Sequence, residues 1–200
     1  MKTIAQWTSA VVAVAVLGLA GLATGGETKP EPGKKTDAAR AGKKLELPAP
    51  PQEVADLMKL MGGTWKCTGK AWMPDGSEHE MVGTLTSKPH FDGFWAHDSW
   101  DGKMSGLPFK FDTYSTYDAQ LKKWRRVSVT SLGGQLVGTS EGLKDQKMDF
   151  TMEVTGMMGA LMLLEHIDLS DPRTGARLWT ERTLDKGKTW QKDFELLCKK

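Results

Sequence analysis

The chain has 200 residues, which is enough for one domain with a well-buried core. Its 27 Lys and Arg residues nearly balance its 25 Asp and Glu residues, and the small surplus is not gathered in a basic stripe. This distribution argues against nucleic acid as a partner. Twenty-two glycines and eight tryptophans indicate many turns and short strands rather than a helical bundle.

Residues 1–23 have the pattern of a signal peptide. Lys2 supplies a short positive region, residues 10–23 form an apolar run, and small residues around its end offer cleavage sites. An uncleaved anchor is the alternative, although the run is shorter than the ~20 apolar residues that span a bilayer. We therefore predict export by a bacterium-like route to the periplasm or the extracellular space, with no transmembrane segment in the mature chain.

Residues 24–50 predict a disordered tether. The segment is rich in Pro, Gly, Lys and Ala and has almost no large apolar side chains, so it cannot offset its ordering entropy by burial. Its excess of Lys and Arg allows a weak contact with an anionic membrane surface, although a solvated linker is the favoured interpretation. The folded domain is expected over residues 51–200.

A short helix and then only strands are expected after the tether. The helix covers residues 51–61, where Val54, Leu57, Met58 and Met61 share one face, and a Gly-Gly pair ends it. The later connectors carry turn residues, as in PDG and DPRTG. The ten predicted strands cover residues 64–73, 79–87, 93–100, 108–117, 123–131, 135–142, 147–155, 161–169, 177–184 and 189–198.

The two cysteines lie in the first and last predicted strands. In an oxidising compartment Cys67 and Cys198 favour a disulfide over free thiols, and the C-x-x-C spacing of many metal or redox sites is absent. A disulfide requires α-carbons within about 7 Å, so the first and last strands must be neighbours. Ten antiparallel strands form a sandwich or a barrel. The bridge selects the barrel, and the predicted fold is all-β: a closed antiparallel up-and-down barrel of about ten strands preceded by a short helix.

Four segments carry a recognisable pattern: a short helix and Gly-x-Trp in LMGGTWKCTGKAWMPDG, then FDGFWAHDSW, YSTYDAQLKKWRRVSVTS and TERTLDKGKTWQKDFEL. In these segments, over roughly residues 55–200, the chain resembles the calycin superfamily of lipocalin-like barrels and, more closely, a bacterial lipocalin-like family of unknown function. The resemblance implies that Trp65 packs as a plug at the closed end of the barrel. It also implies a basic residue stacked over that tryptophan, for which Lys199 and Lys200 are the candidates. It implies no particular chemistry.

The closing hairpin contains a candidate ligand anchor. A turn centred on Lys186 and Gly187 would place Trp179 opposite Phe194 and Glu181 opposite Lys192. Strand parity would then put Lys192 inside the barrel, on the face of Trp190. The Glu–Lys pair could bind a ligand head group, or it could be an ordinary cross-strand pair near the rim, because turn registers slip easily.

The segment FWAHDSW offers a second candidate. Trp95 and His97 share one strand face, and an aromatic pocket containing one histidine suits a ligand site. The alternative is a surface histidine beside aromatic residues that pack elsewhere. Alternation does not say which face is inside.

No metal, cofactor or catalytic residue is predicted. The four histidines lack H-x-H or H-x-x-x-H spacing. A haem ligand at His166 is disfavoured, because the apolar residues around it put Glu165 inside and His166 outside. The methionines at 157, 158 and 162 suggest core packing, a portal lip or, less readily, a Cu(I) site. Neither G-x-S-x-G nor a convincing acid–base pair is present.

These observations favour an exported barrel that carries or senses a small, mainly apolar or amphipathic molecule. The first alternative is an envelope protein-interaction module with a filled barrel, and the second is an isomerase-like enzyme. An empty interior would favour the ligand-binding protein. The predicted ligand-binding residues are Trp179, Glu181, Trp190, Lys192, Trp95 and His97.

Overall fold

The computed structural model describes residues 47–156, 161–171 and 175–200. The predicted signal peptide and most of the predicted tether, together with Met157 and Met158, lie outside these residues. Within the described part of the chain, no helix is both long and apolar enough to cross a membrane.

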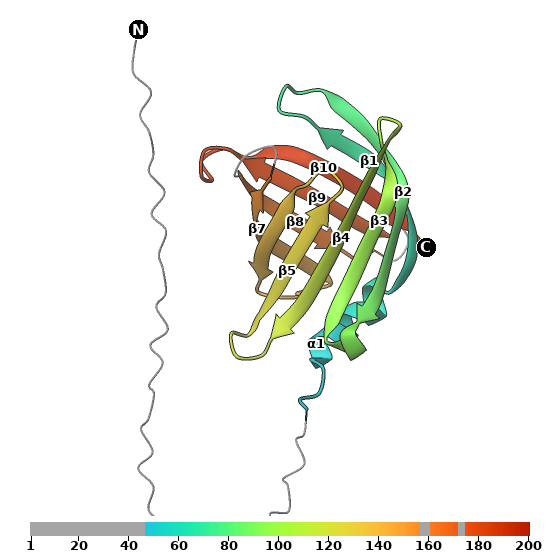
Figure 1. Cartoon of the computed structure of the whole chain (residues 1–200), viewed down its shortest axis with the longest axis vertical. Coiled ribbons are helices and arrows are strands. Elements are labelled where there is room, and N and C mark those ends of the chain that lie inside the picture. Colours follow the sequence, from blue (N-terminus) through green and yellow to red (C-terminus); the bar gives the residue numbers. More distant parts are fainter. Residues whose placement is uncertain (1–46, 157–160, 172–174) are drawn as a thin grey trace, which may run out of the picture. The chain divides into compact units, whose positions relative to one another are not determined.

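Ten antiparallel strands form a closed barrel in which every strand pairs with its neighbours in the sequence (Figure 1). The last strand pairs with the first, which confirms the predicted up-and-down barrel. The strands are β1 (Gly63–Trp72), β2 (Glu78–His90), β3 (Trp95–Met104), β4 (Leu107–Asp118), β5 (Lys123–Thr130), β6 (Gln135–Ser140), β7 (Lys147–Thr155), β8 (Leu161–Asp168), β9 (Ala176–Thr183) and β10 (Gln191–Lys199).

The main differences from the predicted ranges are at β2 and β3. Their pairing runs without interruption from Met81 opposite Met104 to His90 opposite Trp95, so each strand ends at least three residues later than predicted. A short 3-10 helix, η1 (Phe91–Gly93), makes the connection between them. Mutual hydrogen bonding, rather than the local alternation of residue types, therefore sets the length of this pair.

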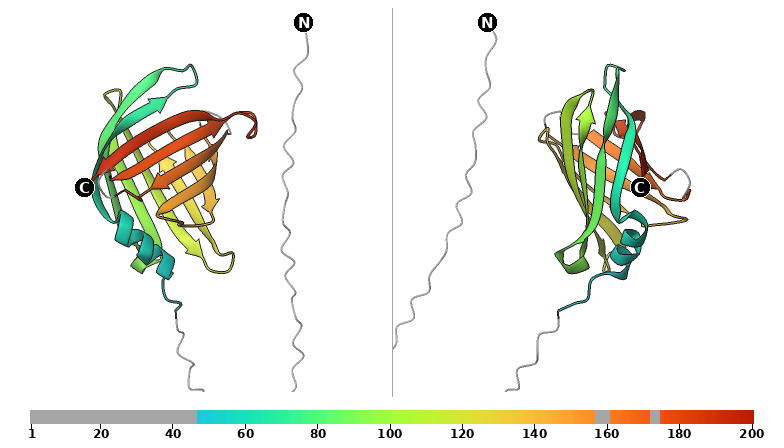
Figure 2. Two further views of the ribbon diagram at one scale, coloured as in Figure 1. Left: turned by 180° about the vertical axis from the view of Figure 1, so that it is seen from behind. Right: turned by 90° about the vertical axis from the view of Figure 1, so that its right-hand side faces the viewer.

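The helix α1 (Gln52–Met61) covers one end of the barrel, as the different views agree (Figures 1 and 2). Its buried residues are Val54, Leu57 and Met61, three of the four predicted from the helical period. Trp65 lies beneath the end of the helix, where its Nε1 donates a 2.7 Å hydrogen bond to the carbonyl of Met61. The tryptophan thus ties the first strand to the helix that precedes it.

A basic residue stacks on Trp65 from the other end of the sequence. Lys200 Nζ lies 4.6 Å from the centroid of the Trp65 ring, within the range of a cation–π interaction. This is one of the two lysines that the resemblance singled out.

The predicted disulfide joins Cys67 to Cys198. The two residues lie directly opposite each other in the β1–β10 pairing, and both are buried. The bridge therefore fixes the one seam of the barrel whose strands are most distant in the sequence.

The half of the barrel nearest α1 is filled by large side chains. The starts of β5, β7 and β9 and the ends of β8 and β10 lie at this end, as the chain direction requires. Their inward residues are almost completely buried: Trp124, Met148, Phe150, Ile167, Leu178 and Leu196. The core thus lies between α1 and the middle of the barrel.

Replacing both cysteines by serine should lower the free energy of unfolding by about 4–5 kcal/mol. The bridge spans a sequence separation of 131 residues, so its loss returns much conformational entropy to the unfolded chain. Urea unfolding followed by tryptophan fluorescence measures the change. The reduced wild-type protein should match the double variant, and equal stabilities of the oxidised and reduced protein would contradict the expectation.

Candidate functional site

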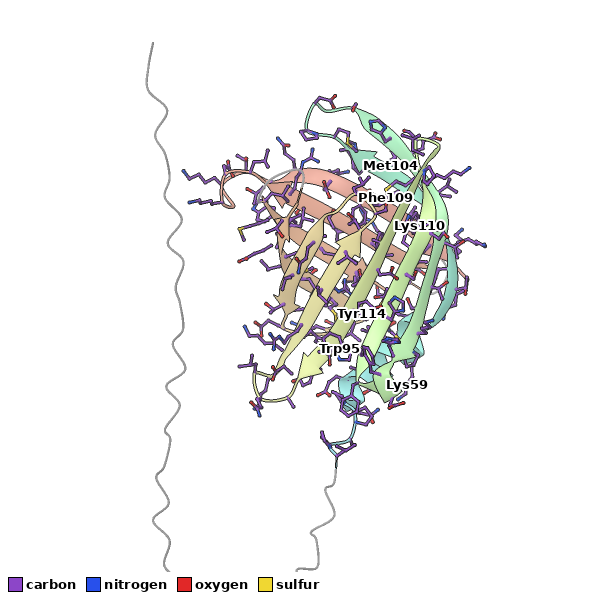
Figure 3. The ribbon with its side chains drawn as sticks, viewed as in Figure 1. Lys59, Trp95, Met104, Phe109, Lys110 and Tyr114 are labelled. Atoms are coloured by element: carbon purple, nitrogen blue, oxygen red, sulfur yellow. A yellow bond between two sulfur atoms is a disulfide. The ribbon has the colours of Figure 1, made fainter. Side chains whose placement is uncertain are left out.

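A cavity of about 330 Å³ lies inside the barrel. Its lining includes Leu132 and Gly134 of the β5–β6 turn and Gly156 after β7, which are at the end of the barrel opposite α1. Figure 3 shows another lining residue, Phe109, toward that end, whereas Tyr114 and Trp95 lie toward α1. The barrel is therefore filled in one half and hollow in the other.

The walls of the cavity are largely apolar. Alternation along each strand turns every second side chain inward, so β4, β6, β7, β8 and β10 all contribute to them. The main apolar lining residues are Phe111, Leu136, Met152, Val154, Leu163 and Phe194. Such walls suit an apolar molecule and offer it few hydrogen-bonding groups.

A buried ion pair lies at the deep end of the cavity. Glu165 lines it, and its Oε1 accepts a 2.7 Å hydrogen bond from Arg126 Nη1. Arg126 also donates from Nε to Ser115 Oγ at 2.9 Å, and its guanidinium lies 3.9 Å from the centroid of the Phe150 ring. Only 2% of the Arg126 side chain is exposed, so this arginine is held by the protein on several sides.

A second carboxylate faces Arg126 from β3. Asp98 Oδ2 lies 3.8 Å from Arg126 Nη2, which has no hydrogen-bond partner among the described residues. Burial raises the pKa of the Asp98 carboxyl, and the nearby Arg126 charge opposes that rise. Asp98, Arg126 and Glu165 border a separate small cavity of about 20 Å³ below the main one.

A bulge in β10 brings a further acid to the cavity. The β9–β10 register shifts between Lys192 and Phe194, and both Asp193 and Phe194 line the cavity. Asp193 accepts hydrogen bonds from Thr180 Oγ1 and from Arg182 Nη1, each at 3.0 Å. Burial raises the pKa of the Asp193 carboxyl against these two contacts.

The bulge also corrects the prediction for the closing hairpin. Glu181 does lie opposite Lys192, as predicted, but Trp179 lies opposite Glu195 and not Phe194. The extra residue reverses the strand parity, so the assignment of Lys192 to the interior is wrong. Its side chain is exposed, with Nζ 5.2 Å from the centroid of the Trp72 ring.

Trp179 stacks with a neighbouring histidine outside the cavity. Its ring centroid lies 4.7 Å from that of His166, and the guanidinium of Arg177 lies 4.5 Å from the Trp179 ring. His166 also bonds to Asp149 at 2.7 Å, while its neighbour Glu165 lines the cavity. This confirms the expected orientation of residues 165 and 166.

The second predicted group lies on β3, away from the cavity. His97 stacks on Tyr114 with ring centroids 4.5 Å apart and bonds through Nε2 to Asp112 at 2.7 Å. Trp95 is two residues away on the same strand, and Trp190 precedes β10. None of the six residues predicted to bind a ligand is among the described residues that line the main cavity: Trp179, Glu181, Trp190, Lys192, Trp95 and His97.

Sequence reasoning missed Arg126 because apolar residues alternate with it. Val127 and Val129 suggest that their own face of β5 is the inner one, yet Val129 is 49% exposed and Arg126 is buried. The position of Trp124 in the sequence could have indicated that Arg126 points inward. Trp124 is buried, and it shares the face of Arg126 and Ser128.

Replacing Arg126 by methionine should lower the free energy of unfolding by about 3–5 kcal/mol, because it leaves Glu165 and Asp98 buried without their cation. The matched control is Arg125→Met on the same strand. Its side chain is 62% exposed and 3.5 Å from Asp118, so the expected cost is about 0–1 kcal/mol. Urea unfolding compares the two variants, and equal costs would contradict the assigned role.

The difference in stability between the wild type and Asp193→Asn should depend on pH. The folded wild type binds the Asp193 proton more tightly than the unfolded chain does, because the pKa is raised above its ordinary value of 3.8. The contribution of Asp193 to the free energy of unfolding therefore falls as pH rises from 3.8 through the folded pKa, and the variant lacks that contribution. When both proteins are unfolded at several pH values, the free energy of unfolding of the wild type minus that of the variant should fall as pH rises through this range. Parallel profiles would contradict it.

Comparisons with known proteins place the chain in a family. No curated protein sequence matches it. Among solved structures it is similar to Rv2717c from M. tuberculosis, with 11% identity and a TM-score of 0.55, covering 72% of this chain and 95% of that one. This similarity supports the barrel fold alone. A family model matches residues 50–165, more than half of the chain. The chain therefore belongs to DUF1579, a family of proteins of unknown function.

Proposed function

We propose that this protein is an exported, lipocalin-like barrel that carries or senses a small, mainly apolar molecule in its interior. The observation that carries the proposal is the cavity of about 330 Å³ in the half of the barrel away from α1. Its volume falls at the small end of the range of roughly 300–1,000 Å³ that is typical of ligand pockets.

The arrangement of the barrel supports this function. One end is covered by α1 and filled by a dense core, while apolar side chains line the hollow half. An interaction module with a filled barrel would leave no such volume. Glu165, which pairs with Arg126, gives the deep end of the cavity a hydrogen-bonding group that can orient a ligand.

Export is the second part of the proposal. The Cys67–Cys198 disulfide is typical of an oxidising compartment, and residues 1–23 have the composition of a signal peptide. We propose that the protein is located in the periplasm or the extracellular space. Residues 24–50 would then be a tether that can make weak contact with an anionic membrane surface.

Filling the cavity should weaken the binding of an apolar probe. The probe is N-phenyl-1-naphthylamine, whose fluorescence rises in an apolar site. It is titrated into a solution of the mature protein. Leu136 lines the cavity, whereas the next residue, Val137, is 50% exposed on the outer face. Leu136→Trp should weaken binding about tenfold or more, since overpacking costs roughly 1–3 kcal/mol. The matched variant Val137→Trp should bind like the wild type.

Two results would contradict the proposal. One is the absence of probe binding by the folded wild type, and the other is equal loss of binding in both tryptophan variants. Native mass spectrometry of the protein purified from its own envelope adds an independent test. A reproducible extra mass that organic extraction removes would identify the bound molecule.

A further inference from the structure

The charged side chains that line the cavity are of one sign. Among the described residues they are Glu165 and Asp193, and no lysine, arginine or histidine accompanies them. A ligand that enters the barrel therefore meets carboxylate oxygens, which accept hydrogen bonds and repel anions.

The two interior arginines are bonded mainly to the protein itself, and each keeps one nitrogen without a hydrogen-bond partner among the described residues, Arg126 Nη2 and Arg182 Nε. Arg126 donates to Ser115 and Glu165, and its side chain is 2% exposed. Arg182 donates from Nη1 to the Trp72 carbonyl at 2.7 Å and to Asp193, and its side chain is 5% exposed. Neither lines the main cavity.

Glu165 is placed to receive the polar end of a ligand. It borders both the main cavity and the small cavity beneath it, as do Phe111, Thr113 and Phe194, which puts it at the deep end. One oxygen accepts from Arg126, and 17% of the side chain is exposed. A carboxylate has about four acceptor positions, so Glu165 can accept a further hydrogen bond from a ligand.

Two hydroxyl groups extend this polar patch. Thr113 Oγ1 and Ser128 Oγ lie 2.7 Å apart, and both residues line the cavity. One hydroxyl proton is used between them, so the other hydroxyl can donate to a ligand and the remaining lone pairs can accept from it. The walls above the patch are apolar, so the cavity suits an amphipathic molecule with its polar end pointing inward.

We infer that the ligand has a hydrogen-bond-donating polar end, an amine or a hydroxyl, that binds Glu165 at the base of the cavity, and that carboxylate or phosphate ends are rejected. This inference rests on the proposed binding function and adds the chemical class of the ligand. An anionic end would be desolvated beside Glu165 and Asp193, and the arginine partners of these carboxylates do not line the main cavity, which disfavours its binding.

The test compares three ligands with the same chain: decanol, decylamine and decanoate. Each displaces N-phenyl-1-naphthylamine from the wild-type protein at neutral pH and below its micellar concentration. Decanol and decylamine should displace the probe, with decanoate at least about tenfold weaker than decanol, a difference of roughly 1.4 kcal/mol. Decanoate that equals or exceeds decanol would overturn the inference. This comparison needs no variant.

A variant tests the assigned residue. Glu165→Gln removes the negative charge and releases Arg126 from its carboxylate, so the decanol preference over decanoate should fall about tenfold. Glu153→Gln on the outer face of β7 is the matched control and should keep the wild-type preference. An unchanged preference in Glu165→Gln, with its fold verified by circular dichroism, would overturn the role of Glu165.

The displacement experiment distinguishes a wrong ligand class from a wrong binding function. If the probe binds but decanoate competes as well as decanol, the barrel binds ligands and only the inferred class is wrong. If the wild type binds neither the probe nor any of the three ligands, the proposed function and the inference fail together.

Discussion

The pairing of β1 with β10 is the constraint on which the rest of the structure depends. It turns ten strands into a closed sheet, and it joins residues near the two ends of the folded domain. Closure leaves no sheet edge and gives every strand one inner and one outer face. The Cys67–Cys198 bridge and the stacking of Lys200 on Trp65 both lie at this seam. The position of every inward side chain then follows from its register with the neighbouring strand.

The sizes of the inward side chains decide where the barrel is hollow. Toward α1, Trp124 and Phe150 occupy the interior together with several aliphatic residues. In the same strands but farther from α1, the inward residues are smaller, as at Ser128, Thr130 and Val154. The same ten strands form both halves of the barrel, and the smaller residues leave space between them. The cavity is thus a consequence of side-chain volume along strands that are otherwise alike.

The ion pair between Arg126 and Glu165 lies at the boundary between these halves. A buried pair contributes little more to stability than well-packed apolar residues would, because both charges lose their hydration. Stability alone therefore gives no reason for its place in the barrel. Its contact with the cavity through Glu165 connects it to ligand binding, and Ser115 and Phe150 hold the arginine in place. An interior of this kind combines an apolar wall with a rigid polar base.

The sequence by itself determined the barrel and its seam. Turn residues separated ten strands, and Cys67 and Cys198 could meet only if the first strand lay beside the last. The apolar residues at alternate positions on either side of Glu165, which are Leu161, Leu163, Ile167 and Leu169, also placed Glu165 inside. Only the tertiary structure decided the inner faces of β5 and β10. In β5 valines alternate with Arg126, and an arginine is inward only because strands on other sides of the barrel supply Glu165 and Asp98. In β10 one extra residue reverses the parity, so Asp193 enters the cavity and Lys192 leaves it. Partners that come from distant strands, and a bulge that depends on pairing with β9, leave no local pattern in the sequence.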